Sequence, residues 1–282
     1  MKASTLFSEV HQLKLGLIEN CWWSSPVGPV EGIKIAKEMG FDSYDIFPLN
    51  TSVEVRKAQR RAFKENEMPC SSFIVAANGL TDFVPEMRKA TIDYVRKELE
   101  IGFDFDSPTM VLVLGNYSYE KREFKPEEQW NWAVEGVREI ADYSKSLGIE
   151  IALEYVPYMF YLLDSVDHMA KFIKDADHPV VKANADVSHL FLMGDDPETL
   201  ERLRNKIINI HFSDCDGKVH EDLPPGRGVV PLKRYLHVLK DIGVSCPVSI
   251  ELQWPNDPTQ IRSWVFEAYS ATAKMMQELG LR

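Results

Sequence analysis

The chain has little cysteine and no long apolar run. Among its 282 residues there are four cysteines, Cys21, Cys70, Cys215 and Cys246, with no C-x-x-C pair. Small secreted domains that depend on disulfides use cysteine more densely, so free thiols in a reducing compartment are expected. No apolar run approaches the roughly 20 residues that span a bilayer, and the N-terminal MKASTLFSEVHQLKLG lacks the apolar core of a signal peptide. These absences predict a cytoplasmic protein with no membrane partner.

Positive charge is also scarce. Lys and Arg total 32 against 43 for Asp and Glu, which gives a formal net charge of −11. Proteins that bind duplex nucleic acid normally present a cationic surface to the phosphates, so a general nucleic-acid binder is excluded. Hydrophobic residues make up 45% of the chain and charged residues 27%, which is ordinary for a globular protein with a large core. Disorder and a fibrous fold are therefore excluded as well.

What the chain does contain is a regular alternation of two patterns. Short apolar or β-branched runs alternate eight times with longer segments of helical period, about one unit per 35 residues, the length of a βα unit. Near-continuous apolar strands are typical of a parallel sheet covered by helices. No G-x-G-x-x-G follows the first strand and no Walker A motif is present, which argues against an open doubly wound sheet. The sequence predicts an α/β fold, a (β/α)8 TIM barrel, that forms a single domain over residues 1–282.

The expected elements follow from these runs. The predicted strands cover residues 13–21, 43–47, 71–76, 110–114, 150–155, 180–185, 207–212 and 247–252. The predicted helices cover 30–39, 52–66, 84–102, 126–147, 166–175, 231–242 and 259–279, with one more beginning at 196–197. Pro126 and the two glutamates after it form a good helix start, because proline suits the first turn and acidic residues favour the positive end of the helix dipole.

Polar side chains stand at the ends of the last four predicted strands. These residues are Glu154, Asp186, His211 and Glu251, in strands five to eight. Active sites of (β/α)8 barrels form where the strands end at the C-terminal face, so we expect the four side chains to converge. Three carboxylates and one imidazole in an apolar barrel mouth would be strongly destabilising unless a cation lay between them. The sequence therefore predicts a divalent metal bound by these four residues.

The ligand types restrict the metal. Oxygen-rich ligands with a single nitrogen favour Mn²⁺ or Mg²⁺, and Co²⁺ and Zn²⁺ are alternatives, whereas a structural zinc site would use thiolates. We expect Mn²⁺. The alternative interpretation is that each residue is a solvated loop residue or a strand cap, but four of them at four consecutive strand ends make that interpretation weak.

Taken together, these motifs resemble the xylose isomerase-like TIM barrel superfamily. It contains sugar isomerases and epimerases, inosose-processing enzymes and the endonuclease-four type (AP endonuclease family 2) of DNA repair enzyme. The resemblance covers the whole chain. Its most specific parts are Glu154, the D-x-x-H of Asp186 and His189, the H-x-S-D run from His211 to Asp214, the P-G-R-G turn around Arg227, and Glu251 in S-I-E-L.

The resemblance implies a chemistry for these residues. The four strand-end residues would hold the metal, and His189 would face the substrate and donate to one of its oxygens. Glu154 and Glu251 would act as the acid–base pair that moves a proton next to a carbonyl through an enediolate. Arg227 or Lys218 would hold a substrate hydroxyl or carboxylate. We therefore expect a metal-dependent isomerase or epimerase of a sugar, keto-sugar or cyclitol.

The sequence departs in two places from the best-known epimerases that it resembles. The segment YVPYMFY after Glu154 has none of the Asn, Arg and Glu residues that those enzymes carry there, and Gly217 stands where they have a substrate-binding arginine. Aromatic residues suit a substrate with a bulkier or aromatic group, because their faces stack on sugar CH surfaces and flat rings. The predicted aromatic mouth consists of Trp22, Trp23, Phe47, Tyr155, Tyr158 and Phe160, with Trp22 and Tyr155 as substrate contacts.

Other functions remain open or are rejected at this point. The alternative is a metal-dependent lyase, whose reaction begins with the same proton abstraction as that of an isomerase. It would be either the large subunit of a C-glycoside deglycosidase acting on 3-oxo-glycosides or a dehydratase of keto-inositols or keto-acids. A trinuclear zinc site for DNA repair would require histidines in SSFIVAANG and LVLGNYS at the ends of strands three and four, and there are none. A barrel without catalysis is disfavoured by the complete ligand set. The expected partners are a small sugar or glycoside, further copies of this chain, and a small subunit if the protein is a deglycosidase.

Overall fold

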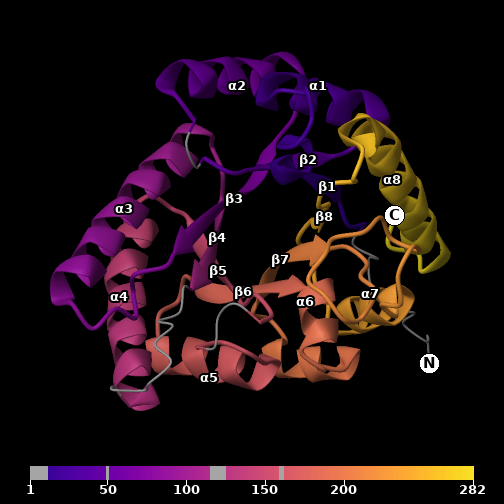
Figure 1. The fold of residues 1–282 in the computed structure, drawn as a ribbon. Helices are drawn as coiled ribbons and strands as arrows, with labels where there is room; N and C mark the ends of the chain where they lie inside the picture. Colours follow the sequence, from indigo (N-terminus) through magenta and orange to yellow (C-terminus); the bar gives the residue numbers. More distant parts are fainter. Residues whose placement is uncertain (1–11, 49–50, 115–124, 159–161) are drawn as a thin grey trace, which may run out of the picture.

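A closed barrel of eight parallel strands forms the centre of the computed structural model, which describes residues 12–48, 51–114, 125–158 and 162–282 (Figure 1). Each strand pairs with the next in sequence, and β8 pairs with β1 to close the barrel. This confirms the predicted (β/α)8 TIM barrel. The strands are β1 Leu15–Ile18, β2 Ser43–Ile46, β3 Cys70–Ala77, β4 Thr109–Leu114, β5 Glu150–Glu154, β6 Val181–Asp186, β7 Ile207–Phe212 and β8 Val248–Ile250.

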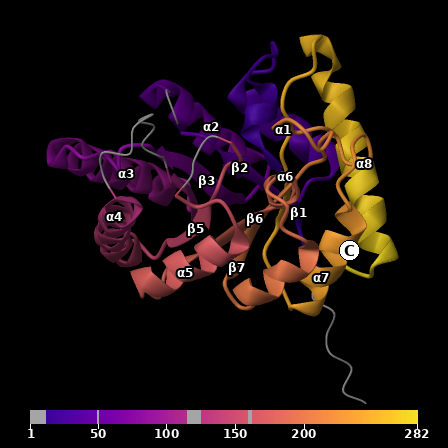
Figure 2. The same cartoon turned by 60° about the horizontal axis from the view of Figure 1, so that its bottom comes forward.

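Helices form a ring outside the barrel, as both views of the ribbon show (Figure 1; Figure 2). Helix α1 begins at Pro29, whose fixed φ suits a first turn, and ends at Gly40, whose φ of +97° is in the left-handed region that glycine adopts at low cost. No helix in the described ranges is long and apolar enough to cross a bilayer. The helices are α1 Pro29–Met39, α2 Val53–Glu65, α3 Pro85–Asp104, α4 Pro126–Ser146, α5 Val166–Ala176, α6 Val187–Leu192, α7 Leu232–Asp241 and α8 Ile261–Glu278.

Three short 3₁₀ helices account for the main differences from the expected elements. The strand expected over 13–21 ends at Ile18, because the chain turns into the 3₁₀ helix Glu19–Trp22. Another, Pro258–Gln260, precedes α8. The helix expected to begin at 196–197 is the 3₁₀ helix Pro197–Leu203, and the α-helix of that unit, α6, precedes it.

Helix α6 begins directly after β6 because Asp186 caps it. The Asp186 Oδ1 atom accepts hydrogen bonds from the backbone N–H groups of Ser188, at 2.9 Å, and His189, at 3.0 Å. This is the side-chain cap that satisfies the free N–H groups of a helix start. One carboxylate oxygen of Asp186 is therefore used by the fold, and His189 is fixed at the end of a barrel strand.

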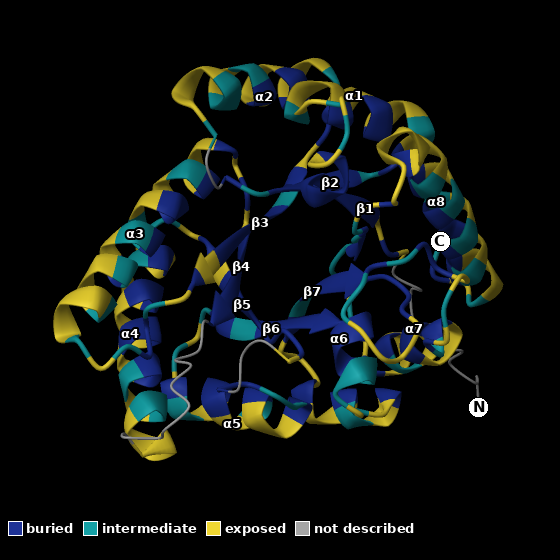
Figure 3. Cartoon of the chain, in the orientation of Figure 1, coloured by how far each residue is buried: buried dark blue, intermediate teal, exposed yellow. Residues whose placement is uncertain are grey.

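Buried residues occupy the strands and alternate with exposed residues along the surrounding helices (Figure 3), and the apolar ones form two clusters. The larger cluster lies between the strands and the surrounding helices. A smaller cluster contains Ile18, Val111 and Ala152 from β1, β4 and β5, which can meet only inside the barrel. Toward β8 and β2 the interior is polar instead, since an added Cβ at Gly16 of β1 would lie 2.6 Å from Ser249 Oγ and 2.8 Å from Ser43 Oγ. The barrel interior thus has an apolar side and a hydroxyl-rich side.

Candidate metal centre

The structure brings the four strand-end residues together at one end of the barrel. Glu154 and Asp186 are the last residues of β5 and β6, His211 lies in β7, and Glu251 follows β8. Each side chain offers one nitrogen or oxygen atom, and these four atoms all lie within 4.8 Å of one another. The side chains are buried, and the most open of them, Glu251, is only 13% exposed. The convergence follows from the parallel barrel, in which all strands end on the same face.

The carboxylate oxygens surround one nitrogen of His211. Its Nδ1 atom lies 2.8 Å from Glu154 Oε1, 3.2 Å from Glu251 Oε2 and 3.8 Å from Asp186 Oδ2. Despite these distances, neither ring nitrogen of His211 makes a hydrogen bond of good geometry, and Asp186 Oδ2 makes none either. Buried polar atoms normally have partners, so atoms that converge without pairing fit a shared cation. Three carboxylates and one imidazole are also the donor set of a hard divalent ion.

Asparagine side chains hold two of the carboxylates in place. Asn184 Nδ2 donates to Glu154 Oε1 at 2.7 Å, and Asn20 Nδ2 donates to Glu251 Oε1 at 2.8 Å. The amide of Asn184 is itself fixed by Asn209 Nδ2, at 3.1 Å. Sequence reasoning missed all three asparagines. The one available signal was that Asn184 stands two residues before Asp186 on the same strand and therefore shares its face.

Burial and neighbouring charge shift the pKa values of these groups. Burial, together with the charge of Asp222, raises the pKa of Glu251 to about 7. Burial also tends to raise the pKa of Glu154, but the imidazoles of His211 and His189 outweigh it and the pKa is lowered. Burial opposes protonation of His211, yet Glu154 and Glu251 hold its pKa well above the usual range. The centre thus concentrates negative charge around one position.

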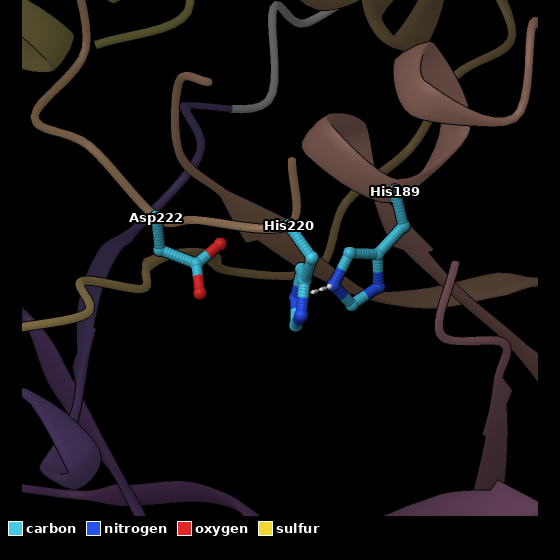
Figure 4. A group of neighbouring side chains, drawn as sticks. All are labelled: His189, His220 and Asp222. Atoms are coloured by element: carbon cyan, nitrogen blue, oxygen red, sulfur yellow. Dashed lines mark hydrogen bonds between the residues drawn. The ribbon is translucent and has the colours of Figure 1, made fainter. Parts of the chain in front are cut away.

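A second cluster adjoins this centre and contains His189, His220 and Asp222 (Figure 4). His189 Nδ1 lies 3.0 Å from the backbone carbonyl oxygen of Tyr155, which can only accept, so this nitrogen carries the hydrogen. The other nitrogen, Nε2, lies 2.8 Å from His220 Nε2. Asp222 is buried and accepts a hydrogen bond from Ser213 Oγ at 2.9 Å. The sequence assigned His220 no role, because it lies in an aperiodic loop.

The remaining predicted substrate contacts lie in different surroundings. Tyr155 is buried, and its hydroxyl donates to Asp195 Oδ2 at 2.9 Å. Trp22 is buried against α1, where an added Cβ at Gly32 would lie 2.4 Å from its Nε1 atom. Its neighbour Trp23 is 50% exposed. Trp23 and Tyr158 are therefore exposed to solvent, whereas Trp22 and Tyr155 are not.

Arg227 is paired with α8 and not with the candidate metal-binding residues. Its Nε and Nη2 atoms donate to the two carboxylate oxygens of Glu267 on α8, at 2.8 and 2.6 Å. The guanidinium also lies over the ring of Trp264, 4.8 Å from its centroid. The turn that carries Arg227 is held by Asp214, which accepts backbone hydrogen bonds from Gly226 and two further residues. Lys218, the other predicted clamp, is exposed.

Exposed aromatic rings line the rim beside β1 and β8. The Trp23 ring stacks on Trp254, with centroids 6.2 Å apart, and meets Phe47 edge-on at 4.9 Å. Trp254 Nε1 donates to the backbone carbonyl of Asn20, whose side chain holds Glu251. The rim is therefore joined to the metal centre through one residue. Sequence reasoning missed Trp254, and the predicted Phe160 lies outside the described residues.

Comparison with known proteins shows the family and the fold. The family model described as xylose isomerase-like TIM barrel matches residues 33–277. The D-psicose 3-epimerase of Ruminiclostridium cellulolyticum is 30% identical over 228 residues, which cover 77% of this chain and 75% of that protein. The L-ribulose-5-phosphate 3-epimerase UlaE of Escherichia coli K12 is 24% identical over 291 residues, which cover 94% of this chain and 98% of that protein. The structure of the IolI protein, solved with a zinc atom, is similar in fold, with a TM-score of 0.83 at 20% identity over 94% of this chain and 99% of that chain.

Proposed function

The chain belongs to the xylose isomerase-like TIM barrel family, and we propose that it is a divalent-metal-dependent epimerase or isomerase of a sugar, keto-sugar or cyclitol. The observation that carries the proposal is the convergence of four side chains with ligand atoms within 4.8 Å of one another, two of which, His211 Nδ1 and Asp186 Oδ2, lack hydrogen-bond partners. The substrates named for the two curated relatives, a ketose and a ketose phosphate, support the substrate class.

Glu154, Asp186, His211 and Glu251 would hold the ion, and we propose Mn²⁺. The zinc atom in the IolI structure supports a divalent ion in this fold. When bound, such an ion polarises adjacent carbonyl and hydroxyl oxygens of a substrate and stabilises the charge of an enediolate. Asp186 is suited to binding rather than to proton transfer, because its Oδ1 atom already caps α6.

Glu154 and Glu251 are the proposed acid–base pair. They stand at the ends of β5 and β8, on different sides of the barrel mouth, so a substrate between them would present one face to each carboxylate. Asn184 and Asn20 hold these carboxylates in fixed positions, which favours a directed proton transfer. One glutamate would take the proton from the carbon next to the carbonyl, and the other would return a proton on the opposite face.

The substrate would be held by His189 and by the aromatic rim. The carbonyl of Tyr155 fixes the His189 ring, and the edge of that ring toward His220 is the one proposed to meet a substrate oxygen. Trp23 and Trp254 offer exposed faces for sugar CH groups. Trp22 and Tyr155 are buried, and Arg227 is paired with Glu267. These three predicted contacts would therefore act on the substrate indirectly, through the residues that they pack against or pair with.

The test combines metal analysis with isotope exchange. Protein purified without added metal should contain close to one equivalent of a divalent ion, and turnover of a ketose panel should be lost with chelator and restored with Mn²⁺. In D₂O the epimerised product should carry deuterium at the inverted carbon, because the proton is exchanged at a carboxylate. His211→Ala should abolish both metal and turnover, while His237→Ala, an exposed histidine on α7 paired with Asp241, should retain both.

Two results would contradict the proposal. Protein that holds less than a tenth of an equivalent of metal and gains nothing from added Mn²⁺, Mg²⁺, Co²⁺ or Zn²⁺ would refute the metal centre. Release of the aglycone from a 3-oxo-glycoside, without epimerised product, would instead assign the protein to the lyases. A cytoplasmic location and self-association also remain predictions, to be tested by fractionation and by sedimentation.

A further inference from the structure

One nitrogen of His211 faces away from the carboxylates. Nδ1 is surrounded by Glu154, Asp186 and Glu251, whereas Nε2 is buried and has no hydrogen-bond partner of good geometry. A histidine that binds metal through one nitrogen almost always donates the hydrogen of the other to an acceptor, which fixes the tautomer and the ring orientation. An acceptor for Nε2 is therefore expected inside the barrel.

Ser249 lies beside His211 in the barrel wall. The two residues are register partners on β8 and β7, so their side chains share a face. Ser249 is fully buried, and its Oγ atom has no hydrogen bond of good geometry. Its other neighbour in register is Gly16 on β1, where an added Cβ would lie 2.6 Å from Ser249 Oγ. The missing side chain at Gly16 gives the Ser249 hydroxyl its space.

A buried carboxylate lies on the other side of Ser249. Asp45 of β2 is fully buried; its Oδ1 atom accepts from Ser71 Oγ at 2.6 Å, while Oδ2 has no partner. Burial raises the pKa of Asp45, and the hydroxyl of Ser249 and the imidazole of His211 lie near enough to oppose that rise. A buried carboxylate with a free oxygen costs stability, so this residue is better explained by a role in the site.

We propose that Asp45 and Ser249 are positioning residues for His211, linked as His211 Nε2–H to Ser249 Oγ and Ser249 Oγ–H to Asp45 Oδ2. None of these three atoms has a partner. His211 Nε2–H is a donor, the Ser249 hydroxyl both accepts and donates, and Asp45 Oδ2 is an acceptor, so a rotation of the Ser249 hydroxyl would complete the chain. This arrangement keeps Nδ1 free of hydrogen and directed at the ion. It rests on the metal centre proposed above.

The first arm of the test measures Mn²⁺ affinity by titration calorimetry. Ser249→Ala and Asp45→Asn should each weaken binding by roughly 10- to 100-fold, the range for loss of a partner behind a metal ligand. The matched control is Ser72→Ala, which removes another buried hydroxyl near Asp45 but not beside His211. It should bind within about threefold of the unmodified protein, because the proposed chain is intact. Normal affinity in both test variants, or an equal loss in the control, would overturn the proposal.

The second arm needs no metal. In protein freed of metal by chelator, the ¹⁵N–¹H signal of His211 Nε2 should be protected from exchange with solvent, and Ser249→Ala should shift this signal and speed its exchange. An Nε2 signal that Ser249→Ala leaves unchanged would refute the chain. Thermal unfolding separates misfolding from the proposed effect, since Asp45→Asn removes a buried charge and should leave the melting temperature unchanged or higher. If the wild type binds no Mn²⁺, the proposed function fails, and this spectrum alone decides the chain.

Discussion

Glu19 provides the sharpest test of how burial acts in this barrel. It is the first residue of the 3₁₀ helix after β1 and is only 3% exposed. Gln59 Nε2 on α2 lies 3.3 and 3.2 Å from its two oxygens. Burial raises the pKa of Glu19 from 4.5 to about 8, although hydrogen bonds from the Phe47 backbone and Gln59 partly oppose it. The native protein therefore carries a protonated Glu19 at neutral pH.

The consequence for stability follows from linkage. A raised native pKa means that the folded state holds the proton more tightly than the unfolded chain, so stability falls as the pH rises from 4.5 to about 8 and is then constant. Each pKa unit corresponds to about 1.4 kcal/mol. The Glu19 carboxyl thus costs about 1 kcal/mol at pH 5, about 3 kcal/mol at pH 7 and about 5 kcal/mol at pH 9.

Glu19→Gln keeps the shape of the side chain and removes the titration. Its free energy of unfolding should exceed that of the wild type by these amounts, so the difference should grow between pH 5 and pH 8. Urea denaturation followed by circular dichroism at several pH values measures it. The control is Glu31→Gln on the exposed face of α1, which should show no such trend. A Glu19→Gln difference that does not change with pH, or that falls as the pH rises, would refute the reasoning.

Three further predictions concern the centre and the barrel beneath it. Mn²⁺ at 100 times its dissociation constant should raise the free energy of unfolding by about 2.7 kcal/mol, and chelator should reverse this in thermal denaturation. Asn184→Ala removes the hydrogen bond to Glu154 and should weaken Mn²⁺ binding by roughly 10-fold or more in calorimetry; unchanged affinity would contradict its positioning role. Gly16→Ala places a Cβ 2.6 Å from Ser249 Oγ and should cost about 1–3 kcal/mol in urea denaturation. Gly28→Ala, where the added Cβ meets nothing within 4 Å, is its control, and equal losses in the two variants would exclude the steric explanation.

Two hydrogen bonds connect the aromatic rim to Glu251, and this connection bears on the substrate specificity of the proposed site. Trp254 is bonded to the backbone of Asn20, and the side chain of Asn20 holds Glu251. A group that displaces Trp254 would therefore act on a proposed acid–base residue. For the proposed substrate, this connection would be a physical route by which the part far from the reacting carbon affects the reaction.

The sequence by itself determined the barrel and the convergence of four candidate metal-binding residues at its mouth. Eight alternations of strand and helix patterns within 282 residues leave few other arrangements, because parallel strands need crossover helices and a closed barrel leaves no free edge. In such a barrel all strands end on one face, so the positions of Glu154 and Asp186 in their strands already place them together. The order of residues along the chain was sufficient for this inference.

Only the tertiary structure decided which side chains support that centre. His189 and His220 are 31 positions apart in the sequence, and Asn20 and Glu251 are 231 positions apart. Such contacts cannot be inferred from the sequence, because loops carry no periodic signal. Arg227 could be a clamp or a surface residue until its ion pair with Glu267 was known. Asp45 looks in sequence like any polar residue of a strand, because whether a buried carboxylate keeps one oxygen unpaired depends on what every neighbouring strand places beside it.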